Sequence, residues 1–148
     1  MLFLRIILNR FSRSTSSARE RKIVFKLIEQ FGDRALIPGY HGSYSLTEVI
    51  TSLEIMRTKL NEALAALSLE VASRGPIEHI RETLYHFENF VVLNSPPKAV
   101  SGAADASIDP EWFVSAATET HRVVGRELTV LARMYKLTLP ESLSGSYE

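Results

Sequence analysis

The residues best suited to chemistry are two histidines and a glutamate at helical spacing. His79, Glu82 and His86 are three and four residues apart, so on a helix they fall within a sector of about 60°. Imidazole and carboxylate groups at this spacing can share a divalent metal ion. The same helical wheel places the sector almost opposite the apolar line of its helix, towards solvent. The three residues are therefore a weak metal candidate, and a solvated or partner-facing polar surface is the favoured interpretation.

Other chemical motifs are missing from the chain. The sequence has no cysteine, which excludes thiol catalysis, zinc ribbons and iron–sulfur ligation. It has no phosphate-binding loop, no dinucleotide-binding glycine pattern, no zinc-protease histidine pair and no nucleophile elbow. No glutamate is followed three residues later by histidine, as di-iron bundles require. We therefore expect no cofactor and no catalytic residue.

Two further candidates have plainer explanations. His121 lies at the edge of an apolar helical stripe, so a hydrogen-bonded boundary histidine is favoured over a general base. The loop 39–44 is rich in glycine and tyrosine, and its backbone amides could approach an anion. It contains no lysine or arginine, so a connector that covers the end of the fold is favoured there.

The net charge of zero conceals a strong asymmetry. The 148 residues hold 17 basic and 17 acidic side chains. Residues 1–26 carry seven of the basic groups against Glu20 alone, a net charge of +6, so the remainder carries −6. Such a division indicates an N-terminal arm with its own role. The arm, residues 1–17, begins with an apolar run and continues with arginine and hydroxyl residues.

Three interpretations of the arm remain open. Its composition suits an organellar transit peptide, which would indicate a mitochondrial or other organellar location in a eukaryote; otherwise we expect a cytoplasmic protein. It also suits an interfacial membrane anchor, in which Leu2, Phe3, Ile6 and Ile7 enter the headgroup region. The third interpretation is a segment docked on the protein's own core or on another subunit.

The rest of the chain, residues 18–137, predicts four helices. Apolar residues recur at steps of three and four over 18–31, 46–73, 76–93 and 110–135. Ser45 and Glu48 form a capping box before the second helix, and the Gly75–Pro76 joint predicts a tight antiparallel hairpin with the third. Asp109 and Pro110 begin the fourth helix, after a long connection over 94–107. Residues 138–148 form a polar tail.

These observations predict an all-α, single-domain, four-helix bundle with a long central hairpin and a basic-apolar arm. No stretch is long or apolar enough to predict a transmembrane helix. The expected role is a non-catalytic interaction or structural subunit of a larger protein assembly, with self-association as one form of it. The expected contact residues are Leu2, Phe3, Arg5, Arg10 and Arg13 of the arm, Arg19 and Arg21 directly after it, and Tyr85, Phe90 and Trp112, which lie off the main apolar seams.

Two alternatives follow from the same residues. A nucleic-acid-associated adaptor would use Arg10, Arg13, Arg19, Arg21 and Lys22 to contact phosphates. A metal-binding or enzymatic bundle would be centred on His79, Glu82 and His86.

Overall fold

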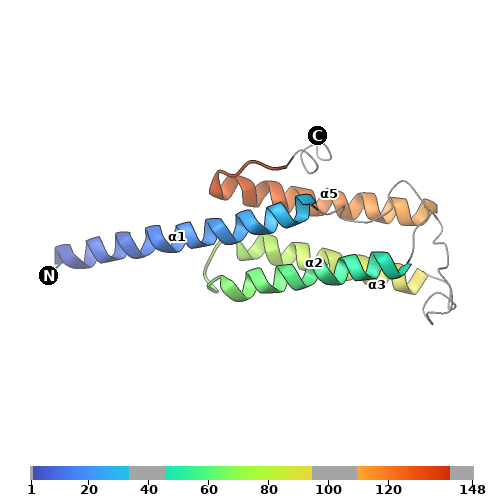
Figure 1. The fold of residues 1–148 in the computed structure, drawn as a ribbon, viewed down its shortest axis with the longest axis horizontal. Coiled ribbons are helices and arrows are strands. Elements are labelled where there is room, and N and C mark those ends of the chain that lie inside the picture. The colour runs from blue at the N-terminus through green and yellow to red at the C-terminus, as the bar shows by residue number, and fades with distance from the viewer. Residues whose placement is uncertain (1, 34–45, 95–109, 141–148) are drawn as a thin grey trace.

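The computed structural model describes residues 2–33, 46–94 and 110–140, with the side chains of the first helix described from Ser17 to Gly32. Four α-helices lie in these ranges (Figure 1): α1 (Leu2–Asp33), α2 (Leu46–Ala66), α3 (Arg74–Asn94) and α5 (Pro110–Tyr135). The described residues contain no strand. The predicted all-α bundle is confirmed.

The helices alternate in direction and enclose one core. The helix α3 packs against α2 and α5, and α1 packs against the same two helices from the other side. Each helix therefore lies next to two others, and α2 and α3 form the predicted antiparallel hairpin (Figure 1). This is the arrangement expected when short connections join amphipathic helices.

The core consists of the apolar stripes that the sequence periodicity predicted. All seven seam residues of the second predicted helix are buried, from Leu46 to Leu67, as are all five of the third, from Ile77 to Val91. Burial of these stripes removes apolar surface from water, which is the main favourable contribution to the fold. The residues that are completely buried include Val24, Val49, Leu53, Leu60, Ile77, Ile80, Leu84, Val91, Phe113, Ala117, Val124, Leu128 and Leu131.

The first helix begins much earlier than its apolar periodicity predicted. Instead of starting at residue 18, α1 runs without interruption from Leu2 and includes the predicted arm. The chain has no glycine or proline before Gly32, so no helix-breaking residue separates the arm from the bundle helix. At a rise of 1.5 Å per residue, the 32-residue helix is about 48 Å long.

The second helix ends earlier than predicted. It stops at Ala66, and Arg74 to Pro76 form the first turn of α3 rather than the end of α2. The guanidinium of Arg74 explains this end: it donates hydrogen bonds of 2.6 Å and 3.1 Å to the carbonyl oxygens of Leu64 and Leu67. Carbonyls in the last turn of a helix lack partners within it, and a nearby arginine can supply them.

Two further helix boundaries, the start of α5 and the end of α3, agree with the sequence prediction. Helix α5 begins at Pro110, and α3 stays helical through Asn94, including a valine-rich end that could also have formed a strand. Ser45, Asp109, the loop 39–44 and nearly all of the connection over 94–107 lie outside the described residues, as does the end of the tail, 141–148.

Candidate functional site

A pair of hydrogen bonds marks the point where α1 leaves the bundle. The hydroxyl of Tyr135, at the end of α5, donates to Oε2 of Glu20 at 3.3 Å. Nε of Arg21 donates in return to the backbone oxygen of Tyr135 at 3.1 Å. Burial raises the pKa of the Tyr135 hydroxyl, which keeps it a donor. Val24, the first fully buried residue among the described side chains of α1, lies one turn further on.

The N-terminal half of α1 extends beyond the end of the bundle (Figure 1). Residues 2–17 span about 24 Å of helix at 1.5 Å per residue. The predicted contact residues Leu2, Phe3, Arg5, Arg10 and Arg13 belong to this half, and their side chains lie outside the described set.

The side chains of the two predicted contact residues that follow the arm, Arg19 and Arg21, are described, and Arg19 is exposed. Arg21 is exposed too, but its Nε is bonded to Tyr135.

A run of aromatic rings connects the surface to the core at the opposite end of the bundle. Phe90 packs edge-on against Trp112, with ring centroids 5.5 Å apart, and Trp112 packs against the buried Phe113 at 6.2 Å. Phe90 remains 43% exposed, and Leu93 close by is 83% exposed. Edge-to-face pairs of this kind add stability beyond simple burial. The structure therefore brings together two of the predicted aromatic contact residues.

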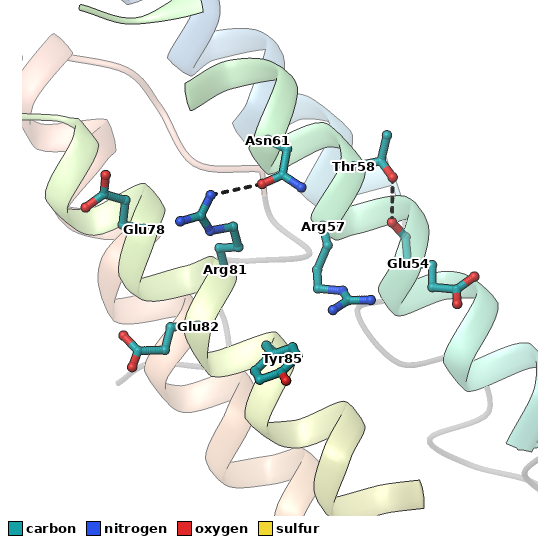
Figure 2. Close-up of a pocket in the computed structure, with 8 residues that line it drawn as sticks. All are labelled: Glu54, Arg57, Thr58, Asn61, Glu78, Arg81, Glu82 and Tyr85. Carbon is teal, nitrogen blue, oxygen red and sulfur yellow. Dashed lines mark hydrogen bonds between the residues drawn. The ribbon is translucent and has the colours of Figure 1, made fainter. Parts of the chain in front are cut away.

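The third predicted aromatic residue, Tyr85, lies in a different place. It lines a groove between α2 and α3 that has a volume of about 830 Å³ (Figure 2). The guanidinium of Arg57 lies 5.7 Å from the centre of the Tyr85 ring, within cation–π range. Half of the Tyr85 surface remains exposed. Tyr85 thus belongs to a polar groove rather than to the Phe90–Trp112 surface.

Charges of both signs line this groove. Arg57 forms an ion pair of 2.9 Å with Glu88, and Arg81 donates a 3.0 Å hydrogen bond across the groove to Asn61 (Figure 2). The carboxylates of Glu54, Glu78 and Glu82 complete the lining. Burial raises the pKa of Glu88, and the charge of Arg57 opposes that rise. Because both guanidinium groups already have partners and three carboxylates lie beside them, the groove does not suit a free anion.

Sequence reasoning missed this groove. Its signal was available: Glu54, Arg57 and Asn61 follow one another at steps of three and four, and Arg81 and Glu82 each lie three or four residues from both Glu78 and Tyr85. Polar residues at that spacing on both helices of a hairpin can line a shared groove.

The histidine and glutamate candidates do not converge on one point. His79 Nδ1 lies 3.1 Å from Oε1 of Glu127, on α5, which ties α3 to its neighbour. His86 Nε2 lies 3.6 Å from Oε1 of Glu82, and both of these side chains are 68% exposed. Among the described residues, no group of three or more histidine, aspartate or glutamate side chains is placed to hold a metal ion.

His121 lies partly buried on α5. This agrees with its predicted position at the edge of the apolar stripe of the helix. Burial lowers the pKa of its imidazole, which favours the neutral form at physiological pH.

Comparisons give no relatives from which a role could be transferred. No family model, curated protein or solved structure matches the chain. In the part that the structure describes, no helix combines the length and the apolar character needed to cross a bilayer.

Proposed function

We propose that this protein is a non-catalytic helical subunit that attaches to other molecules through two surfaces. The first is the N-terminal half of α1. The second is the aromatic surface of Phe90 and Trp112, together with Leu93. The bundle is the scaffold that holds these two surfaces at opposite ends.

One observation carries the proposal: α1 is 32 residues long, and its N-terminal half extends past the end of the bundle formed with the other helices (Figure 1). A helix whose first ten residues include seven apolar ones gains little by standing alone in water, because isolated helices depend on packing of their apolar side chains. The hydrogen bonds at Tyr135 support a role for this half as a fixed extension of the bundle.

The experiment compares three forms of the purified chain: full length, a form lacking residues 2–17, and Phe90→Gln. Analytical ultracentrifugation measures self-association, and affinity capture from the source cells followed by mass spectrometry measures partner binding. We expect a defined complex that the deletion abolishes and Phe90→Gln weakens. A full-length chain that sediments as a monomer and recovers no partner would contradict the proposal.

A nucleic-acid adaptor is the second candidate, because Arg19 and Lys22 are exposed on one side of a junction where α5 adds Arg133. The net charge of −6 over residues 27–148 opposes it. It predicts an RNA affinity that falls steeply as salt rises, since each phosphate contact releases counterions.

A further inference from the structure

Three structural elements meet at one end of the bundle. The α2–α3 connection (residues 67–73), the last turn of α5 and the point where α1 departs all lie there (Figure 1). We call this the projecting end and define it by residues 19–22, 67–73 and 133–136. Its net charge is positive, whereas the net charge of residues 27–148 is negative.

The projecting end is basic, although the body as a whole is acidic. Five exposed cations lie on it, and two of them come from the end of α5, which is far from the N-terminal arm in the sequence. Its two acidic residues are Glu70 and Glu20, and Glu20 accepts the Tyr135 hydrogen bond. The exposed cations are Arg19, Arg21, Lys22, Arg133 and Lys136.

Exposed apolar side chains lie on the same end. Leu69, in the connection between α2 and α3, is 86% exposed, and Met134 on α5 is 45% exposed. Cations and apolar side chains that are exposed together favour a surface that is anionic outside and apolar beneath.

The projecting half of α1 has the same dual character. Seven of the ten residues Leu2–Phe11 are apolar, two are arginines, and the first acidic residue of the chain is Glu20. At 100° per residue, the seven apolar positions are distributed over about 240° of the helix circumference, with Arg10 inside this arc and Arg5 outside it. The long side chain of an arginine can lie along an apolar surface while its charge reaches the headgroups. A neighbouring protein helix covers one stripe, whereas lipid can cover an arc of this width. Because the segment is helical, its backbone groups beyond the first turn are bonded internally and tolerate an apolar environment.

We propose that the projecting end and residues 2–11 attach the protein to the surface of an anionic lipid bilayer. This inference depends on the proposed function, in which the N-terminal half of α1 is an attachment element. Residues 2–11 enter the boundary between headgroups and acyl chains. The five exposed cations meet anionic headgroups, and the acidic remainder of the bundle stays away from them. One short apolar segment is a marginal anchor, and a basic patch supplies the second signal that stable attachment needs.

Charge and apolar character together favour a lipid bilayer over nucleic acid or a second copy of the chain as the binding partner. Nucleic acid would satisfy the cations but would leave the seven apolar residues without a partner. A second copy of the chain offers acidic surface, but its projecting end carries the same positive charge.

The test measures co-flotation of the full chain with vesicles of phosphatidylcholine plus phosphatidylserine, and with vesicles of phosphatidylcholine alone. We expect binding to the anionic vesicles that is stronger than to the neutral ones and falls as salt rises. The double variant Arg133→Gln/Lys136→Gln should weaken binding by about 25-fold, since each cation near the surface contributes about five-fold. The matched control Arg122→Gln/Arg126→Gln removes two exposed cations of α5 away from this end and should bind like the wild type.

Ile7→Asn tests the apolar contribution and should reduce binding to both kinds of vesicle without changing the helix content measured by circular dichroism. The inference is overturned if the chain does not float with anionic vesicles. It is equally overturned if both double variants bind alike. A chain that captures a protein partner through residues 2–17 but ignores vesicles overturns this inference and leaves the proposed function standing. A chain that does neither overturns both.

Discussion

The Tyr135 hydroxyl donates a 3.3 Å hydrogen bond to Glu20 Oε2, joining two residues that are 115 positions apart in the chain. The bond closes the ring of helices, because it links the last helix to the first at the end where α1 leaves the core. Arg21 reinforces the same junction through the Tyr135 carbonyl. The polar contact therefore adds to the packing of Val24, Leu27 and Phe31, which holds the second half of the continuous helix α1 on the bundle.

Replacing Tyr135 by phenylalanine should weaken this junction. The substitution removes the hydroxyl and keeps the ring, so we expect the free energy of unfolding to fall by about 0.5–1.5 kcal/mol. Hydrogen exchange should show that the amides of residues 24–31 lose more protection than those of α3. Tyr85→Phe, at a half-exposed ring, is the control and should change neither quantity. Equal exchange protection of α1 in Tyr135→Phe and the wild type would show that the contact does not hold the helix.

Periodicity was sufficient to predict the core but not the ends of the helices. Leu53 and Leu84 were predicted to be buried because apolar residues recur at the helical period, and both are completely buried. The start of α1 was missed because residues 12–17 consist entirely of serine, threonine and arginine. A search for recurring apolar residues cannot follow a helix through such a stretch.

Contacts between distant residues could not be predicted from the sequence. The end of α2 depends on Arg74 reaching back to the carbonyl of Leu64, and Gly75 beside it offered a more obvious stop signal. His79 was expected on a solvent-facing sector and is half exposed, but its pairing with Glu127 depends on how α3 and α5 are placed side by side. The basic character of the projecting end arises in the same way, from cations on two helices at opposite ends of the chain.

His121 should make stability depend on pH. Burial lowers the pKa of His121 in the folded chain, whereas the unfolded value is about 6.5. The unfolded state therefore binds a proton more readily, so this contribution to stability is complete above about pH 6.5 and is lost as pH falls towards the folded pKa. His121→Gln should show a flatter decline of the unfolding free energy over that range. His86→Gln, at a side chain that is 68% exposed, is the control that removes a different histidine. Identical slopes for all three proteins would argue against a buried neutral imidazole.

Phe113 should be among the most sensitive positions in the core. It is completely buried and lies between Phe87, 5.9 Å away, and Trp112, 6.2 Å away, as measured between ring centroids. Phe113→Ala leaves a cavity that its neighbours fill only in part, so chemical denaturation should show a loss of about 3–5 kcal/mol. Leu93→Ala, at a residue that is 83% exposed, should change stability by less than about 0.5 kcal/mol. A loss at Phe113 no larger than at Leu93 would mean that the aromatic run is not part of the core.

Lys136 offers a stabilising substitution. Its φ of 54° lies in the left-handed region, directly after α5. The amide of Leu137 donates to the Ala132 carbonyl at 2.8 Å and that of Lys136 to the Arg133 carbonyl at 3.4 Å, the pair of bonds that defines a Schellman cap. A side chain in this conformation costs about 1–2 kcal/mol, and glycine avoids that cost but loses about 0.5–1 kcal/mol in chain entropy. Lys136→Gly should therefore raise the free energy of unfolding by about 0.5–1 kcal/mol. Lys136→Ala removes the same charge but keeps the Cβ atom, so it should give no gain, and an equal gain from alanine would assign the effect to charge instead of backbone strain.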